Sequence, residues 1–197
     1  MSAMYNDVDR LILERWDDVR ALVDAQRAVQ DRIEAVLSVV KDRLARWAEP
    51  QGYVIDAWPR DAEIHAWPAN WEDKRKGHRA RLVIGGFCPN GFRKVDVPGP
   101  YLWVHTGTLE NFKVKPPERK AFAQALRAAL GAEAASWDAH DVDDDDPLGR
   151  YVTGIDNAGR AKLVSSPDAL FEFCTTHFPT LFALVPAVQG QLDAIQR

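Results

Sequence analysis

The histidines are the residues of this chain with the most capacity for chemistry, and there are five of them: His65, His78, His105, His140 and His177. They show neither the i, i+4 spacing nor the Cys-x-x-Cys companion that is typical of zinc sites. His65 and His105 fall in segments that read as strands, so they could meet across a sheet, with Asp56 or Asp96, in a pocket lined by tryptophan. A cleft at that place would hold a small molecule or a catalytic site. The alternative is that each imidazole is a structural residue with satisfied hydrogen bonds.

An acidic run at residues 141–146 imitates a calcium-binding loop without completing it. Asp141, Asp143 and Asp145 alternate as such a loop requires, but Asp146 stands where the tight turn needs glycine and Val152 where the bidentate glutamate belongs. We expect a solvated acidic loop over residues 138–149, with adventitious cation binding as the alternative.

Other reactive groups have no recognisable context. Cys88 precedes a turn and Cys174 lies on an apolar helical face, and two cysteines give no disulfide framework. Gly85 and Gly86 lie within a predicted strand, where they indicate a bulge and not a phosphate-binding loop. We therefore assign no catalytic residue and expect neither a cofactor nor a metal.

Basic and aromatic residues gather in the middle of the chain. Phosphate groups attract cations, and unpaired bases stack on aromatic rings. We predict a partner-binding surface formed by Trp67, Trp71, Lys74, Arg75, Lys76, Arg79 and Arg81. The alternative is a solvated sheet face with tryptophan in the core.

The formal net charge of −4 is unevenly distributed. Residues 51–120 hold 12 basic and 8 acidic side chains, a net charge of +4, whereas residues 121–197 hold 5 and 11, a net charge of −6. Such polarity can steer a partner. A charge of +4 over this segment is nevertheless far from that of a dedicated nucleic-acid-binding domain, so a protein partner is favoured over nucleic acid.

The elements that position these residues follow from periodicity. Alternating apolar residues predict five strands in an antiparallel meander, joined by short links: residues 53–58, 63–67, 79–87, 92–97 and 101–105.

Helices and a hairpin are predicted after the meander. Pro116 and Pro117 open a middle helix that ends at Gly131. Residues 151–156 and 160–164 flank Asn-Ala-Gly and are interpreted as a β-hairpin. A C-terminal helix starts at Ser166 and is expected to be kinked at its prolines.

The opening segment reads as one helix from about Asn6 to Glu49, ~65 Å long at ~1.5 Å per residue. Its apolar stripe keeps a 4-3 spacing, the pattern of a coiled coil. This helix is longer than a domain of the remaining ~150 residues is wide, so part of the stripe must contact another element or molecule. The predicted oligomerisation residues are Trp16, Val19, Val23, Gln26, Gln30, Ile33, Leu37 and Val40. An ordinary long helix folded onto its own sheet is the alternative.

Runs of like elements indicate an α+β fold. We expect a long helix over residues 1–50, a possible oligomerisation element, and an α+β domain over residues 51–197. No apolar run approaches the ~18 residues of a membrane span, and the start lacks the pattern of a signal peptide. We therefore expect a cytoplasmic protein that binds a protein partner or itself and is more plausibly not an enzyme. Nucleic-acid binding by the basic surface and an enzyme with a His/Trp-lined pocket are the two alternatives.

Overall fold

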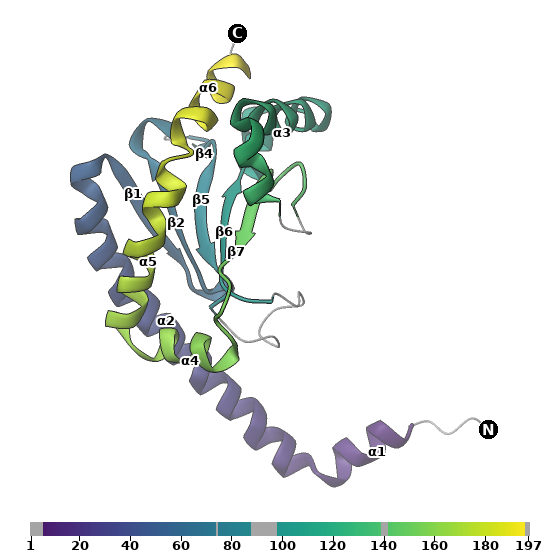
Figure 1. The fold of residues 1–197 in the computed structure, drawn as a ribbon. Coiled ribbons are helices and arrows are strands. Elements are labelled where there is room, and N and C mark those ends of the chain that lie inside the picture. The colour runs from purple at the N-terminus through teal and green to yellow at the C-terminus, as the bar shows by residue number, and fades with distance from the viewer. Residues whose placement is uncertain (1–5, 74, 88–97, 139–141, 196–197) are drawn as a thin grey trace.

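A computed structural model describes residues 6–73, 75–87, 98–138 and 142–195 of the chain. The fold is α+β, as predicted (Figure 1). The helices are α1 (Asp7–Glu14), α2 (Trp16–Ala48), α3 (Pro116–Leu130), α4 (Asn157–Ser165), α5 (Pro167–Phe182) and α6 (Val185–Ile195). The strands are β1 (Tyr53–Trp58), β2 (Glu63–Pro68), β3 (Glu72–Asp73), β4 (Gly77–His78), β5 (Arg81–Gly85), β6 (Tyr101–His105) and β7 (Leu148–Tyr151).

Five strands form one antiparallel sheet in the order β1-β2-β5-β6-β7. The short strands β3 and β4 pair with each other and form a separate two-stranded ribbon. The predicted strand over residues 92–97 lies outside the described residues. The fifth strand of the sheet is β7, which pairs with β6 although 42 residues lie between the end of β6 at His105 and the start of β7 at Leu148.

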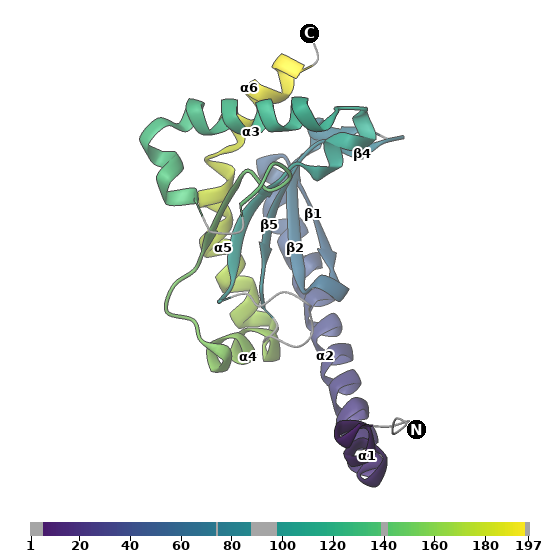
Figure 2. The same cartoon turned by 90° about the vertical axis from the view of Figure 1, so that its right-hand side faces the viewer.

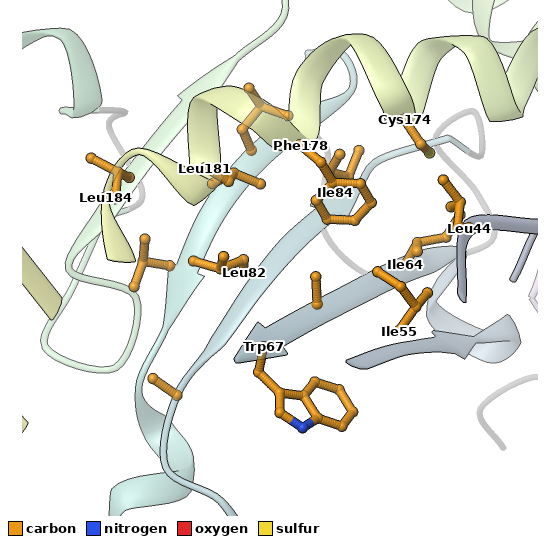
Figure 3. Close-up of a cluster of buried hydrophobic side chains, with 14 of the residues drawn as sticks. Leu44, Ile55, Ile64, Trp67, Leu82, Ile84, Cys174, Phe178, Leu181 and Leu184 are labelled. Atoms are coloured by element: carbon orange, nitrogen blue, oxygen red, sulfur yellow. The ribbon is translucent and has the colours of Figure 1, made fainter. Parts of the chain in front are cut away.

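The sheet has one covered face and one polar face. Helices α2 and α5 lie side by side across the covered face (Figure 1), whereas α3 crosses one end of the sheet (Figure 2). The core forms where Leu44 of α2 and Phe178 and Leu181 of α5 meet Ile64 and Leu82 of the strands (Figure 3). All five of these side chains are fully buried. Alternate residues of each strand point away from this core, and they form what we call the polar face of the sheet.

The long helix is confirmed, with an interruption at Arg15 that separates α1 from α2. Its C-terminal half belongs to the domain, because Ile33, Leu37, Val40 and Leu44 are buried in the core. Residues 7–32 project away from the domain in both views (Figures 1 and 2), and we call this segment the projecting arm. α1 contains no buried residue.

The predicted hairpin over residues 151–164 is wrong. Residues Asn157–Ser165 form α4, and only Tyr151 belongs to a strand. The side chain of Asp156 accepts a hydrogen bond of 2.8 Å from the backbone N–H of Gly159, which satisfies a free donor at the helix start. The Asn-Ala-Gly sequence resembles a turn, but the capping aspartate before it makes it the first turn of a helix.

The proline-kinked C-terminal helix is confirmed. Pro179 lies inside α5, the helix breaks at residues 183–184, and Pro186 is the second residue of α6. After the break, α6 packs on α3. In the part of the chain that the structure describes, no helix has the length and apolar character needed to span a membrane.

Candidate functional site

The polar face of the sheet brings together the two strand histidines that the sequence singled out. In the register of the sheet, His65 of β2 lies opposite Val83 of β5, which lies opposite Trp103 of β6. One row further along, Arg81 lies opposite His105. All five side chains therefore share one face, since residues two apart on a strand point the same way.

These side chains line a cavity of about 260 Å³. Its walls are formed by Trp58, Asp61, Glu63, His65, Arg81, Val83, Trp103, His105 and Asp146. The pocket that the sequence suggested for His65 and His105 is therefore present as a cavity with tryptophan walls. Asp56, one of the two carboxylates expected beside them, pairs instead with Lys41 of α2 at 3.1 Å. The other, Asp96, lies outside the described residues.

The His65 imidazole lies between a carboxylate and a guanidinium group. Its Nε2 lies 2.9 Å from Glu63 Oε2, and its Nδ1 lies 3.3 Å from Nη1 of Arg81. Arg81 can only donate, so Nδ1 accepts, and Nε2 carries the hydrogen and donates a hydrogen bond to Glu63. Burial lowers the pKa of His65, and the hydrogen bond to Glu63 opposes this shift without reversing it. His65 is thus a neutral imidazole that links the two charged groups.

Glu63 also accepts a hydrogen bond from the hydroxyl group of Tyr101. This contact depends on Gly85, because a Cβ atom there would lie 2.6 Å from the Tyr101 ring and 2.7 Å from Cγ of Glu63. Glycine is therefore the residue that lets the tyrosine from β6 cross β5 and reach the carboxylate on β2.

Arg81 is a buried cation with only 6% of its surface exposed. Its guanidinium carbon lies 4.2 Å from the centre of the Trp58 ring, a cation–π contact. Burial lowers the pKa of Arg81, and the charges of Glu63, Asp146 and Asp61 counteract the shift. The guanidinium charge is thus compensated by three carboxylates of the same cavity.

His105 forms a second histidine–carboxylate pair on the polar face. Its Nδ1 lies 2.7 Å from Oδ1 of Asp146. The carboxylate can only accept, so Nδ1–H donates the hydrogen bond, and in the neutral imidazole Nε2 is then an acceptor. A Cβ atom on Gly107 would lie 2.9 Å from Nε2, so this glycine gives the imidazole room.

Asp146 reaches the sheet because part of the acidic run is folded into a turn. The backbone N–H groups of Asp145 and Asp146 both donate to Oδ1 of Asp143, at 2.7 and 2.8 Å. The backbone N–H of Thr106 donates to the carbonyl of Asp145 at 2.6 Å. Residues 143–146 thus lie against the end of β6. Within the described ranges, no three His, Cys, Asp or Glu side chains gather in a way that could hold a metal ion.

The predicted partner-binding residues do not form one exposed surface. Trp67 is 6% exposed and stacks on His78, and Trp71 is fully buried with its indole N–H 2.6 Å from Oε1 of Gln189. Both rings are packed against the chain itself and lack the exposed face that a partner-binding anchor or a base-stacking platform needs. Arg81 belongs to the cavity.

The remaining basic residues lie beside one another at the surface. Arg75 and Lys76 are exposed, and the Lys76 ammonium and Arg79 guanidinium groups lie 5.3 and 5.9 Å from the centre of the Phe112 ring. Lys74 lies outside the described residues. The basic surface predicted from the sequence is therefore reduced to Lys76 and Arg79 beside Phe112, with the exposed Arg75 next to Lys76 in the chain.

The predicted oligomerisation residues divide into two groups. Ile33, Leu37 and Val40 are buried in the protein's own core and are not available to a second molecule. The other five, Trp16, Val19, Val23, Gln26 and Gln30, lie on the projecting arm, where Trp16 is 57% and Val23 40% exposed. The glutamines lie near the point where the helix leaves the domain, and Gln30 donates to Glu34 of the same helix at 3.2 Å.

The sequence analysis missed Glu63, Asp146 and Trp58 as members of the site. Glu63 carried a usable signal, since it precedes His65 by two residues and so shares its face of a strand. Asp146 carried none, because its contact with His105 joins residues 41 positions apart.

Comparisons of this chain with known protein families, with curated proteins and with solved structures gave no match.

Proposed function

We propose that this protein is a binding protein that self-associates through its projecting arm. One observation carries the proposal: the distribution of exposed large hydrophobic side chains. Ten such side chains occur among the described residues, and nine of them lie on α1 or α2: Val8, Leu11, Ile12, Leu13, Trp16, Leu22, Val23, Val29 and Val39. The tenth is Trp58 of the cavity.

This distribution is unusual for an isolated chain. Single exposed apolar residues are normal, but a contiguous apolar patch marks an interaction surface. Most helical stability in proteins comes from packing of the apolar face, and no residue of the arm before Ile33 is buried. Pairing would stabilise the arm by about 25 cal/mol for each Å² of apolar surface removed from water.

A second copy of the chain is the partner that best fits the arm. Trp16, Val19 and Val23 follow the 4-3 spacing that lets two helices pack knobs into holes. Two copies present the same stripe to each other, as a two-fold symmetric interface requires.

The charges along the helix favour antiparallel pairing. Residues 7–18 hold five acidic and two basic side chains, a net charge of −3. Residues 35–46 hold three basic and one acidic side chain, a net charge of +2. Antiparallel pairing would bring the acidic arm of one copy towards the basic C-terminal part of α2 of the other, whereas parallel pairing would align like charges.

Charged substitutions on the arm test this proposal. We expect the double variant Trp16→Glu, Val23→Glu to sediment as a monomer, because it places four carboxylates in the paired seam of the dimer. Val39→Glu is the matched control, since Val39 is 49% exposed on the same helix but lies off the seam. The control should retain the dimer in sedimentation velocity, and circular dichroism should show that both variants stay folded. A double variant that sediments like the unmodified chain would remove the arm from the interface.

The exposed cations Arg75, Lys76 and Arg79 are the second part of the proposal, as a surface that attracts an acidic protein partner. Their support is that Arg75 and Lys76 are exposed. Nucleic acid is the alternative ligand of this surface, and it predicts retention of DNA or RNA at ~50 mM salt that falls steeply as salt rises.

A further inference from the structure

The cavity on the polar face presents a carboxylate and an indole ring to solvent, whereas its cation is buried. Trp58 is 38% exposed, and the side chain of Asp146 is 21% exposed. Arg81 is only 6% exposed, and its guanidinium group packs against the Trp58 ring at 4.2 Å. A molecule that enters the cavity therefore meets a negative charge and an aromatic surface before it meets the positive charge.

Asp146 has an oxygen atom that a ligand can contact. Its Oδ1 accepts a hydrogen bond from Nδ1 of His105 at 2.7 Å. Its Oδ2 accepts no hydrogen bond from any described residue and is accessible to solvent. The other two carboxylates of the lining, Asp61 and Glu63, already interact within the chain. The direct contact with a ligand therefore falls to Asp146.

The charge of the lining favours a cation. Three carboxylates, those of Asp61, Glu63 and Asp146, face the single guanidinium group of Arg81. The described lining thus has a formal charge of −2 when its histidines are neutral. Walls of low dielectric constant concentrate such a field inside a cleft and raise the local concentration of counter-ions. A cation is attracted by this field, an uncharged molecule is not, and an anion is repelled.

The aromatic walls favour an organic cation. Tryptophan has the ring that attracts cations most strongly, and both Trp58 and Trp103 line the cavity. An ammonium ion that carries alkyl groups suits such walls, because its apolar surface is removed from water while its charge lies against the ring. A divalent metal ion needs several oxygen ligands, and within the described ranges no three His, Cys, Asp or Glu side chains gather to hold one.

We propose that this cavity binds a small organic ammonium ion, whose charge lies near the Asp146 carboxylate and against the indole walls. The volume of about 260 Å³ lies just below the ~300 Å³ at which pockets for drug-sized molecules begin, so the ligand is small. No residue of α1 or α2 lines the cavity. Ligand binding is therefore independent of self-association through the projecting arm.

Probes of similar shape and different charge test this site. Choline carries one positive charge, 3,3-dimethylbutanol is its uncharged analogue, and glycine betaine carries a carboxylate beside the same ammonium group. Tetramethylammonium is a smaller cation. Each probe is titrated to ~10 mM into the full-length, ¹⁵N-labelled protein, with sodium chloride holding the ionic strength constant.

The indole N–H signals of the protein report the binding. We expect the Trp58 signal to shift saturably with choline or tetramethylammonium. The affinity should be about tenfold higher for the better of these two cations than for the uncharged analogue or for betaine. The indole N–H of Trp71, already bonded to Gln189, is the internal control and should not move.

Substitutions make the assignment specific. Asp146→Asn removes one negative charge and keeps an acceptor for His105, and it should weaken cation binding about tenfold. Trp58→Leu removes an aromatic wall and should weaken binding about two- to fivefold. Asp144→Asn is the matched control, because Asp144 belongs to the same acidic turn and is exposed but does not line the cavity. It should leave the affinity unchanged.

Three outcomes would overturn the proposal. The first is the absence of a saturable shift of the Trp58 signal with both cations. The second is an affinity for the uncharged analogue or for betaine that equals the affinity for the cations, which would show that the charge of the lining does not select the ligand. The third is full affinity in a folded Asp146→Asn protein, which would show that this carboxylate takes no part.

Discussion

At the scale of single residues, burial decides which side chains of this protein carry charge. His65 and His78 both have lowered pKa values, and loss of solvation is the largest cause for each. Arg81 lies close to both and adds its own repulsion to a second positive charge. His65 and His78 are therefore held neutral near the buried Arg81 guanidinium.

His78 gives this effect a measurable consequence for stability. Burial lowers its pKa to about 4 from an ordinary value of 6.5. Between these pH values the unfolded chain binds a proton that the folded chain does not, so the free energy of unfolding falls as the pH drops from 6.5 and levels off below about 4. The charge of Arg81 acts in the same direction, and that of Asp56 acts against it.

The variant His78→Phe isolates this contribution, because phenylalanine keeps a ring stacked on Trp67 and cannot be protonated. We expect the unmodified protein to lose more stability than the variant when urea denaturation is repeated from pH 7.5 down to pH 4. Other titrating groups are common to both proteins and cancel in the difference. Parallel pH profiles would show that His78 is protonated equally in the folded and unfolded states.

At the scale of elements, local sequence patterns predicted those strands and helices whose formation depends mainly on local interactions. Alternation of apolar residues predicted β1, β2, β5 and β6, and proline followed by an apolar face predicted α3. The hairpin prediction over residues 157–165 was wrong for a local reason. Asp156 caps a helix whose first residues, Asn-Ala-Gly, resemble the sequence of a turn. The pairing of β7 with β6 needed tertiary information, because the two strands are separated by α3 and an acidic loop.

The Asp156 cap can be tested by itself. Replacing Asp156 with alanine should lower the free energy of unfolding by about 1 kcal/mol, because the N–H of Gly159 loses its acceptor. Asparagine caps helices nearly as well as aspartate, so Asp156→Asn should retain most of the stability. Equal stability of the alanine and asparagine variants in thermal melts would mean that the cap contributes nothing to the fold.

Two glycines allow the same substitution to be compared in opposite settings. At Gly149 an added Cβ would lie 2.7 Å from the Trp103 ring, so Gly149→Ala should destabilise the protein by about 1–3 kcal/mol. At Gly190, within α6, the added atom meets nothing within 4 Å. Gly190→Ala should therefore stabilise the protein by about 0.5–1 kcal/mol. A denaturant midpoint of Gly149→Ala that is not lowered would contradict this account of the Trp103 environment.

At the scale of the whole molecule, the projecting arm is the feature that the domain alone does not explain. The 4-3 stripe runs at the same spacing from Trp16 to Val40, and spacing cannot show where a helix leaves its own core. The structure puts that point just before Ile33, the first buried residue of α2. Prediction of the site was limited in a similar way. The sequence indicated that His65 and His105 could lie in one pocket, but it did not indicate that Glu63 and Asp146 line the same cavity.

The arm and the cavity are independent parts of the account. The cavity lies on the polar face of the sheet, and its lining residues come from outside α1 and α2. If the protein does not self-associate, the proposal for the cavity still stands. If the cavity binds no ligand, the proposal that the arm pairs with a second copy still stands.

The most direct test of the central claim is the mass of the full-length protein in solution, measured by light scattering over a dilution series. Self-association through the arm predicts twice the chain mass of 22.1 kDa at high concentration, with a decrease towards 22.1 kDa only on strong dilution. A mass of 22.1 kDa at every concentration would contradict self-association, and the exposed apolar stripe would then require a different partner.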